Sequence, residues 1–149
     1  MEWTRDRFVI SDDPARVDRE LVHRFLRDES YWSRSVPRDV VDRSIDHSLC
    51  FGLYDGDDQV GFARVVSDRS TFAFLADVFV LPTHRGDGLG QWLCRTVLDH
   101  HDLQGLRRIL LGTDDAHGLY ARLGFVPLAD TRRFMEIPQP APEVYRAGA

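Results

Sequence analysis

The sequence predicts an α+β domain in which an antiparallel strand region precedes a strand–loop–helix–strand–helix unit. Two alternating apolar segments flank the turn at residues 55–58, which is typical of a β-hairpin. Residues 71–81 are apolar on both faces and predict a central strand. Three glycines, at positions 86, 88 and 90, separate that strand from an amphipathic helix. A chain of 149 residues suits one such domain.

The first elements follow from apolar spacing and from a capping signal. Residues 4–11 alternate apolar and charged side chains and predict the first strand. Asp13 followed by Pro14 is typical of a helix start, because the carboxylate can cap the first turn and proline fits the first helical position. The apolar stripe of this first helix comprises Val17, Leu21, Val22 and Phe25.

Pro37 opens a second predicted helix, and two strands at residues 50–54 and 60–67 follow it. The turn Asp55-Gly56-Asp57-Asp58 joins these strands and is a strong hairpin signal. The apolar positions of the second helix are Val40, Val41 and Ile45.

The C-terminal part predicts further helices and strands. Residues 108–112 predict a buried strand, and residues 116–123 predict a short helix that Gly124 ends. Residues 126–128 and 133–136 predict a last pair of strands. We expect one domain over residues 1–137, and a loosely ordered Pro/Ala-rich tail over residues 138–149. The helix after the glycine loop carries Leu89, Trp92, Leu93, Thr96 and Val97 on one side.

Composition excludes several classes of protein. The net charge of −5 argues against a general nucleic-acid binder, which needs a basic face. Cys50 and Cys94 lie far apart without a CxxC spacing, so neither a disulfide framework nor a metal site is indicated. No apolar stretch reaches the length of a membrane span, so we expect no membrane partner. A reducing cytoplasm is the simplest location.

The glycine loop is the feature that most directly indicates chemistry. Glycine tolerates positive φ and lets the backbone approach a ligand, and N–H groups at a helix start bind phosphate oxygens. The alternative interpretation is a tight strand-to-helix turn that binds no ligand. Two other phosphate loops fit poorly, because the spacing here is GxGxG rather than GxGxxG, and a Walker loop needs a lysine that this sequence lacks.

Two motifs in this order resemble the GNAT superfamily of N-acetyltransferases. Val80-Leu81-Pro82 precedes Arg85-Gly86-Asp87-Gly88-Leu89-Gly90, as in the family's V-x-P strand end and its [QR]-x-x-G-x-[GA] loop. Residues 116–125 read AHGLYARLGF, which is similar to the family's second motif. The resemblance covers most of residues 31–135. It implies a mixed, mostly antiparallel sheet of six to seven strands, about four helices, and a splay between strands 4 and 5.

The resemblance also implies acetyl-CoA as co-substrate and assigns residues to it. The backbone of Val78, Phe79 and Val80 would bind the pantetheine arm and polarise the acetyl carbonyl, and amides of residues 85–90 would hold the pyrophosphate. Asp87 departs from the Lys, Arg or Gly common in the family, and a carboxylate beside a pyrophosphate is unfavourable unless it points to solvent. Thr113 stands where many relatives carry a pantetheine-binding Asn.

Two residues are candidates for proton transfer. By its resemblance to the family Tyr120 would be the general acid near the thioester sulfur, although its spacing also fits an apolar helix face. Asp77 interrupts the most apolar strand, where an unpaired carboxylate is costly. Either Arg64 or another cation pairs with it, or it faces the cleft as the general base.

The acceptor site is expected between the first two helices, where the family usually builds it. Tyr31 and Trp32 would form an aromatic wall suited to a cationic amine, although core packing explains Trp32 nearly as well. His117 is a further substrate-binding candidate. We expect direct transfer of the acetyl group, in a ternary complex, to a small primary amine. A protein or peptide amine and a non-catalytic acyl-CoA-binding module are the alternatives, and homodimers are common in the family.

Overall fold

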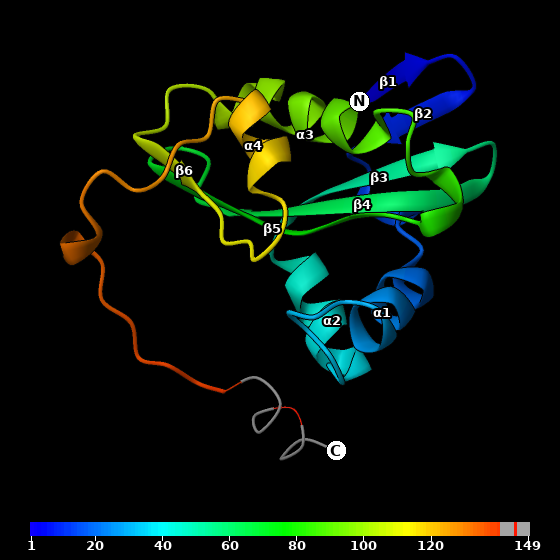
Figure 1. Cartoon of the computed structure of the whole chain (residues 1–149). Coiled ribbons are helices and arrows are strands. Elements are labelled where there is room, and N and C mark those ends of the chain that lie inside the picture. The colour runs from blue at the N-terminus through cyan, green and yellow to red at the C-terminus, as the bar shows by residue number, and fades with distance from the viewer. Residues whose placement is uncertain (141–144, 146–149) are drawn as a thin grey trace.

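The computed structural model describes residues 1–140 and residue 145, and its centre is a six-stranded sheet (Figure 1). Neighbouring strands follow one another in the sequence and pair antiparallel, except β5 and β6, which are parallel. This arrangement confirms the predicted α+β class and its mixed, mostly antiparallel sheet. The strands are β1 (Glu2–Arg5), β2 (Phe8–Ser11), β3 (Leu49–Asp55), β4 (Asp58–Ser67), β5 (Phe72–Val80) and β6 (Arg108–Leu110).

Helices cover both faces of the sheet. The helices are α1 (Arg19–Asp28), α2 (Arg38–Asp46), α3 (Leu89–Asp99) and α4 (His117–Arg122). Helices α1 and α2 lie against one face, while α3 and α4 lie on the other (Figure 1). The α1–α2 core includes a close stack of Phe25 on Phe79, with ring centroids 3.9 Å apart. On the opposite face, Leu89, Leu93 and Val97 of α3 bury the apolar side that the sequence predicts.

The predicted first strand is wrong in its extent, because residues 4–11 contain a turn. Two strands, β1 and β2, meet at Asp6, whose φ of 54° reverses the chain. The alternation of apolar and charged residues continues across this turn, and no glycine marks it. An aspartate rarely adopts the left-handed backbone conformation, so the sequence pattern did not indicate a turn at this position.

The first helix begins later than predicted. Asp13 accepts a hydrogen bond from the amide of Ala15 and caps only a short 3₁₀ turn at Pro14–Arg16. Helix α1 has its own cap at Asp18, whose carboxylate accepts from the amide of Leu21 at 3.0 Å. The prediction that Pro37 opens the second helix is confirmed, because Pro37 is the residue immediately before α2.

The C-terminal strand prediction is wrong. Among residues 1–140, β6 is the last strand, and residues 126–128 and 133–136 lie outside the sheet. The side chains of Val126, Met135 and Ile137 do not pack against the sheet, because these residues are 81%, 97% and 87% exposed. The predicted tail falls largely on residues 141–144 and 146–149, which lie outside the described residues.

The two strands next to the site are less buried than predicted. Phe72 and Phe74 of β5 are 38% and 39% exposed, while Ala73 and Leu75 face the core. The prediction of two buried faces is therefore wrong for this half of β5. Strand β6 ends at Leu110, two residues before its predicted end, and its residues are exposed or half-buried. The early end of β6 opens the sheet at the site.

Candidate active site

The sheet parts between β5 and β6. These strands pair only through Phe72–Phe74 and Arg108–Leu110. After Leu110 the chain leaves β5 and leads to α4, so no described strand pairs with this side of β5 near Val78. The opening lies at the splay predicted between the fourth and fifth strands, because the first predicted strand is two strands here.

A bulge in β5 lies beside the opening. Phe79 pairs with Phe62 and Ala76 pairs with Arg64, so Asp77 and Val78 together face a single residue of β4. Asp77 has φ of 52°, a conformation that costs an L-residue about 1–2 kcal/mol. A bulge bends its strand and redirects nearby backbone groups. The bulge thus gives Val78 a backbone direction that regular pairing would not allow.

Hydrogen bonds and an ion pair hold the Asp77 carboxylate. Its Oδ2 accepts from Arg64 Nε at 2.8 Å, and its Oδ1 accepts from Trp32 Nε1 at 2.9 Å. The side chains of Asp77 and Arg64 are 8% and 16% exposed, and Arg64 also donates to Ser48. Of the two alternatives open from the sequence, the structure shows the ion pair with Arg64, formed at the wall of the opening.

The glycine loop leaves a row of amides without partners. Gly86 and Gly88 have φ of 99° and 71°, and Gly88 is the residue immediately before α3. Within the described chain, the amides of residues 86–91 donate no hydrogen bond, and the first donor of α3 is Trp92, to the carbonyl of Gly88. A methyl group built on Gly86 or Gly88 would meet nothing within 4 Å. Open space and free donors at a helix start suit a phosphate group.

Side chains support this loop from behind. Arg85 Nε donates to the carbonyl of Val80 at 2.9 Å, and Arg5 donates to the carbonyl of Asp87 at 2.9 Å. His84 Nε2 lies 3.0 Å from Asp55 Oδ2, and this contact helps to hold the pKa of Asp55 below its usual range. Asp87 itself is exposed to solvent.

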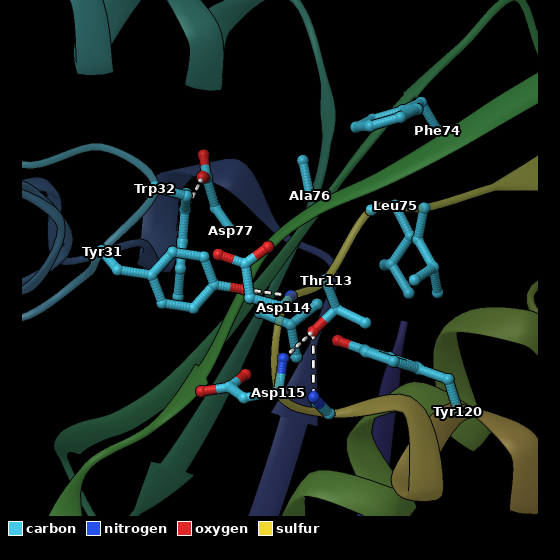
Figure 2. Close-up of a pocket in the computed structure, with 14 residues that line it drawn as sticks. Tyr31, Trp32, Phe74, Leu75, Ala76, Asp77, Thr113, Asp114, Asp115 and Tyr120 are labelled. Carbon is cyan, nitrogen blue, oxygen red and sulfur yellow. Dashed lines mark hydrogen bonds between the residues drawn. The ribbon is translucent and has the colours of Figure 1, made fainter. Parts of the chain in front are cut away.

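Two hollows meet at the opening. The glycine-loop cleft, of about 540 Å³, runs along Val78–Val80 and the loop, and is also lined by Glu29, His84 and Arg122. The aromatic cavity, of about 570 Å³, shares Tyr120 with that cleft and is also lined by Phe74, Asp77 and residues 111–116 (Figure 2). Both hollows are lined by Tyr31, Trp32, Val78, Asp115, Ala116 and Tyr120.

Tyr31 and Trp32 join the two walls of the aromatic cavity. Their rings meet edge to face with centroids 5.0 Å apart. The Tyr31 hydroxyl oxygen accepts from the amide of Asp114 at 2.8 Å, while Trp32 donates to Asp77. The segment after α1 is thereby tied both to β5 and to the loop before α4 (Figure 2).

Tyr120 lies at the junction of the two hollows. Its hydroxyl end points toward the loop at Thr113 (Figure 2). Burial is the main cause that raises the pKa of Tyr120, and the nearby Cys94, Tyr31 and Asp115 act in the same direction. The phenol therefore stays protonated and can donate at neutral pH.

Two predicted residues are placed differently from the rest. Thr113 Oγ1 accepts from the amide of Ala116 at 3.0 Å and helps to shape the turn into α4, although it also lines the aromatic cavity. His117 lies apart from Tyr31 and Trp32, in a third hollow of about 500 Å³ lined by apolar residues such as Ile109 and Phe125. The structure therefore separates His117 from the other two predicted substrate-binding residues.

Comparison with known proteins assigns the family. The model of the Acetyltransferase (GNAT) family matches residues 19–125. The chain belongs to the GNAT family. The matched region spans the aromatic segment after α1, the bulged strand β5, the glycine loop and α4, so it contains both hollows. The resemblance read from the two sequence motifs is confirmed.

Individual relatives agree with this assignment. "Putative acetyltransferase FG08082" of Gibberella zeae is 32% identical over 142 residues, covering 80% of this chain and 79% of the relative. A crystal structure of a GNAT-family protein from Xanthomonas campestris pv. campestris superposes with a TM-score of 0.89 at 48% identity, covering 93% of this chain and 97% of the other. A Staphylococcus aureus structure, SA2161, shares the fold alone, with a TM-score of 0.70 at 22% identity over 89% and 99% of the two chains.

GNAT members are acetyltransferases that use acetyl-CoA, and this chain is one. The geometry fits that co-substrate, because the glycine loop offers unpartnered amides and open space beside a bulged strand. The sequence patterns did not indicate Glu29 or Arg122, although both line the glycine-loop cleft. Arg122 could have been found from helical spacing, since it lies on α4 with Leu119 on the cleft side. Glu29 carries no local signal.

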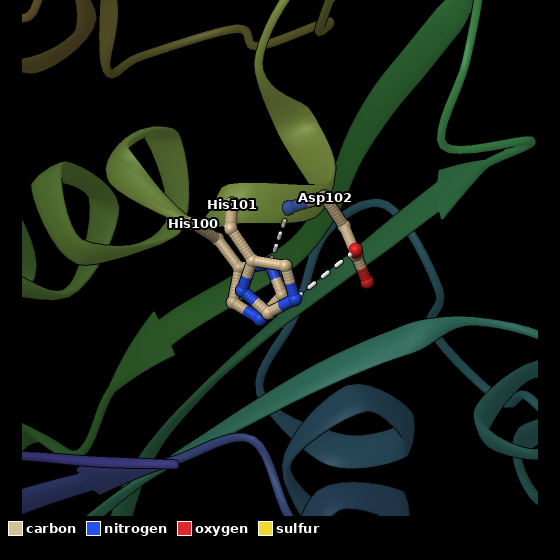
Figure 3. A group of neighbouring side chains, drawn as sticks. All are labelled: His100, His101 and Asp102. Atoms are coloured by element: carbon tan, nitrogen blue, oxygen red, sulfur yellow. Dashed lines mark hydrogen bonds and ion pairs between the residues drawn. The ribbon is translucent and has the colours of Figure 1, made fainter.

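A group of metal-capable side chains lies at the far end of α3 from the glycine loop. The nitrogen and oxygen atoms of His100, His101 and Asp102 come within 4.8 Å of one another (Figure 3). His100 already uses both ring nitrogens, one with Asp12 Oδ2 at 2.9 Å and one accepting from the amide of Asp102. His100 directly follows α3 and is its C-terminal cap residue. Separately, no described helix has the length and apolar character to cross a bilayer.

Proposed function

We propose that this acetyltransferase moves an acetyl group from acetyl-CoA to the primary amine of a small molecule, by direct transfer in a ternary complex. The observation that carries the proposal is the meeting of the glycine-loop cleft and the aromatic cavity at Tyr120 and Val78. Each reactant then has its own space beside the same hydroxyl group. A volume of about 570 Å³ for the aromatic cavity falls in the range of small-molecule sites.

The glycine-loop cleft would hold acetyl-CoA through the backbone. Bound acetyl-CoA supplies a thioester whose carbonyl carbon exchanges its C–S bond for a C–N bond to the amine. The free amides of residues 86–91 bind the pyrophosphate, since unpaired donors at a helix start attract anions. Arg85 and Arg122 add positive charge along this cleft. The edge of β5 at Val78, which no described strand pairs, offers backbone groups to the pantetheine arm, while the carbonyl of Val80 already accepts from Arg85.

Tyr120 is the proposed proton donor to the departing sulfur. Its hydroxyl group stays protonated because burial raises its pKa, so the donor form is present at neutral pH. The proton passes from the phenol oxygen to the sulfur as the C–S bond breaks, and solvent returns a proton to the phenol afterwards. Since a buried phenol is a weak acid, much of its effect comes from a hydrogen bond to the developing negative charge.

The acceptor amine is protonated at neutral pH and must lose a proton before it can attack. For an alkyl amine with a pKa of ~10.4 this deprotonation costs about 4–5 kcal/mol at neutral pH. From the sequence, Asp77 was a candidate base, with an ion pair to Arg64 or another cation as the alternative. Both of its oxygens already accept hydrogen bonds, and Arg64 balances its charge. We therefore assign Asp77 a positioning role on Trp32 and on the bulge. One proton leaves the ammonium group to solvent before attack, and a second leaves the nitrogen to solvent as the amide forms, on the exposed side of the aromatic cavity.

Direct transfer is supported by the state of the thiols. Cys50 and Cys94 are 3% and 0% exposed, and burial raises the pKa of each to about 12. The thiolate is the nucleophilic form of cysteine, so neither residue can readily carry an acetyl group at neutral pH. Neither cysteine lines the glycine-loop cleft or the aromatic cavity.

Ligand-dependent melting and thiol release test the proposal together. Acetyl-CoA at about 100 times its Kd should stabilise the fold by about 2.7 kcal/mol, a shift of roughly 5–10 °C, and NAD should give none. With acetyl-CoA present, small primary amines should accelerate release of free thiol. Acceleration by peptide amines alone would contradict the small-molecule acceptor. An acetylated enzyme that forms, with release of free thiol, before any acceptor binds would contradict direct transfer.

A further inference from the structure

The two hollows that meet at Tyr120 differ in the charge of their lining side chains. The glycine-loop cleft is lined by His84, Arg85 and Arg122 as well as by two acidic residues. The lining of the aromatic cavity includes Asp77, Asp114 and Asp115 but no arginine or histidine among the described residues. Arg64 of β4 does not line this cavity, and its charge is balanced by Asp77. The side chains of the aromatic cavity therefore favour a cation, while in the glycine-loop cleft the unpartnered amides favour an anion.

The carboxylates of Asp114 and Asp115 have no internal partner among the described residues. Asp12, Asp42 and Asp55 each form an ion pair, whereas Asp114 and Asp115 form no side-chain hydrogen bond or ion pair within residues 1–140. Their carboxylates lie on the Tyr31 side of the loop, one above and one below that ring in the view of Figure 2. Two charges are thus presented to the cavity without an internal partner.

Aromatic faces lie beside these carboxylates. Tyr31 and Trp32 are held at their polar ends by the amide of Asp114 and the carboxylate of Asp77, so their ring faces stay in place. Both rings remain 36% exposed or more, and Phe74 adds a third exposed ring across the cavity. Fixed aromatic faces next to carboxylates bind ammonium or guanidinium groups, since the ring face and the carboxylate are both negative.

We propose that the acceptor carries a second positive charge in addition to the amine that is acetylated. One amine of the acceptor lies at Tyr120 and Val78, loses its proton and becomes the amide. The other cationic group stays charged between Tyr31, Trp32, Asp114 and Asp115. Short aliphatic diamines and amines with a guanidinium group have this chemistry. The inference rests on the proposed function, because it assigns the acceptor of that same site.

A matched pair of acceptors tests the proposal. A linear diamine is compared with the monoamine in which a methyl group replaces the second amino group. The wild-type enzyme should prefer the diamine by about 30-fold in kcat/KM. Equal values for the two amines would overturn the inference while leaving the proposed function intact. Thiol release with neither amine would remove the proposed function, and the inference with it.

Two double variants locate the effect. Asp114→Asn with Asp115→Asn keeps the backbone amide that binds Tyr31 and should reduce the diamine preference to about 3-fold or less, because kcat/KM falls mainly for the diamine. Asp57→Asn with Asp58→Asn changes the net charge equally at the β3–β4 turn, far along the chain from the cavity lining, and should leave the preference near 30-fold. An equal loss in both variants would assign the preference to overall charge and overturn the proposal.

Binding without turnover gives a second measurement. By calorimetry, the diamine should bind the wild-type protein more tightly than the monoamine at low salt, and the difference should shrink as salt rises. The Asp114→Asn, Asp115→Asn variant should show little difference at any salt concentration. A salt-independent preference that survives in the variant would contradict recognition by these carboxylates.

Discussion

The glycine-loop cleft and the aromatic cavity share Tyr120 and Val78 but are built differently. The cleft consists mainly of one continuous segment, from the bulge in β5 to the first turn of α3, and its binding groups are backbone amides. The cavity collects side chains from the segment after α1, from β5 and from the loop before α4. A backbone site recognises a feature common to every reaction of the family, while a side-chain site can change with the acceptor.

Removing the Tyr120 hydroxyl should have the largest effect, because both hollows depend on it. In Tyr120→Phe, kcat should fall about 100-fold, and stabilisation by acetyl-CoA should be unchanged. Because burial raises the pKa of Tyr120, the wild-type donor stays protonated as the pH rises, and this group should cause no loss of kcat below about pH 10. Full kcat in the variant would remove Tyr120 from the mechanism.

A side chain in the glycine loop should affect the cleft alone. Gly88→Val should weaken acetyl-CoA about 100-fold, so that stabilisation at the former 100 Kd falls from about 2.7 to about 0.4 kcal/mol. Gly56→Val is the matched control, since Gly56 also has a positive φ of 62° and nothing within 4 Å, but lies in the β3–β4 turn. Both variants should lose about 1–2 kcal/mol of unfolding free energy. Retained acetyl-CoA binding in Gly88→Val would contradict the amide cradle.

Asp77→Asn separates a positioning residue from a base. Asparagine tolerates positive φ and can still accept from Trp32, but it no longer balances Arg64. We expect the acceptor KM to rise about 10-fold, kcat to change less than about 3-fold, and the pH profile of kcat to keep its shape. Unfolding free energy, measured by denaturant titration, should fall by about 2–3 kcal/mol because Arg64 is left half-compensated. A 100-fold loss of kcat with an altered pH profile would restore Asp77 as the base.

The smallest effect is expected from the hydrogen bond that ties Tyr31 to Asp114. Tyr31→Phe should raise the acceptor KM about 3-fold, leaving kcat and acetyl-CoA binding unchanged. Tyr54→Phe also loses a bond to a backbone group, the carbonyl of Arg16, but lies away from both hollows and should leave the acceptor KM unchanged. An equal rise of the acceptor KM in both variants would mean that acceptor binding does not depend on the hydrogen bond between Tyr31 and Asp114.

Sequence patterns predicted the fold well where partners are close in the chain. The β3–β4 hairpin, α2, α3 and the Gly124 end of α4 follow from local signals, and Gly124 has φ of 100° as its C-cap pattern requires. The β1–β2 turn was missed because an aspartate, not a glycine, takes the positive φ there. The last two strands were predicted from residues that favour strands, but pairing needs a distant partner that the pattern does not specify.

The sequence by itself determined the glycine-loop cleft, because positive-φ glycines and a helix start are adjacent residues that create free amides locally. For the aromatic cavity, the sequence indicated Tyr31 and Trp32 through the family resemblance, but tertiary structure alone decided what these side chains contact. Tyr31 meets the amide of Asp114 across 83 residues, and Trp32 meets Asp77 across 45. The ion pair of Asp77 with Arg64 was likewise one of two alternatives until the register of β4 and β5 placed them together. Contacts of this kind depend on how strands and helices pack, and no spacing within one segment encodes that.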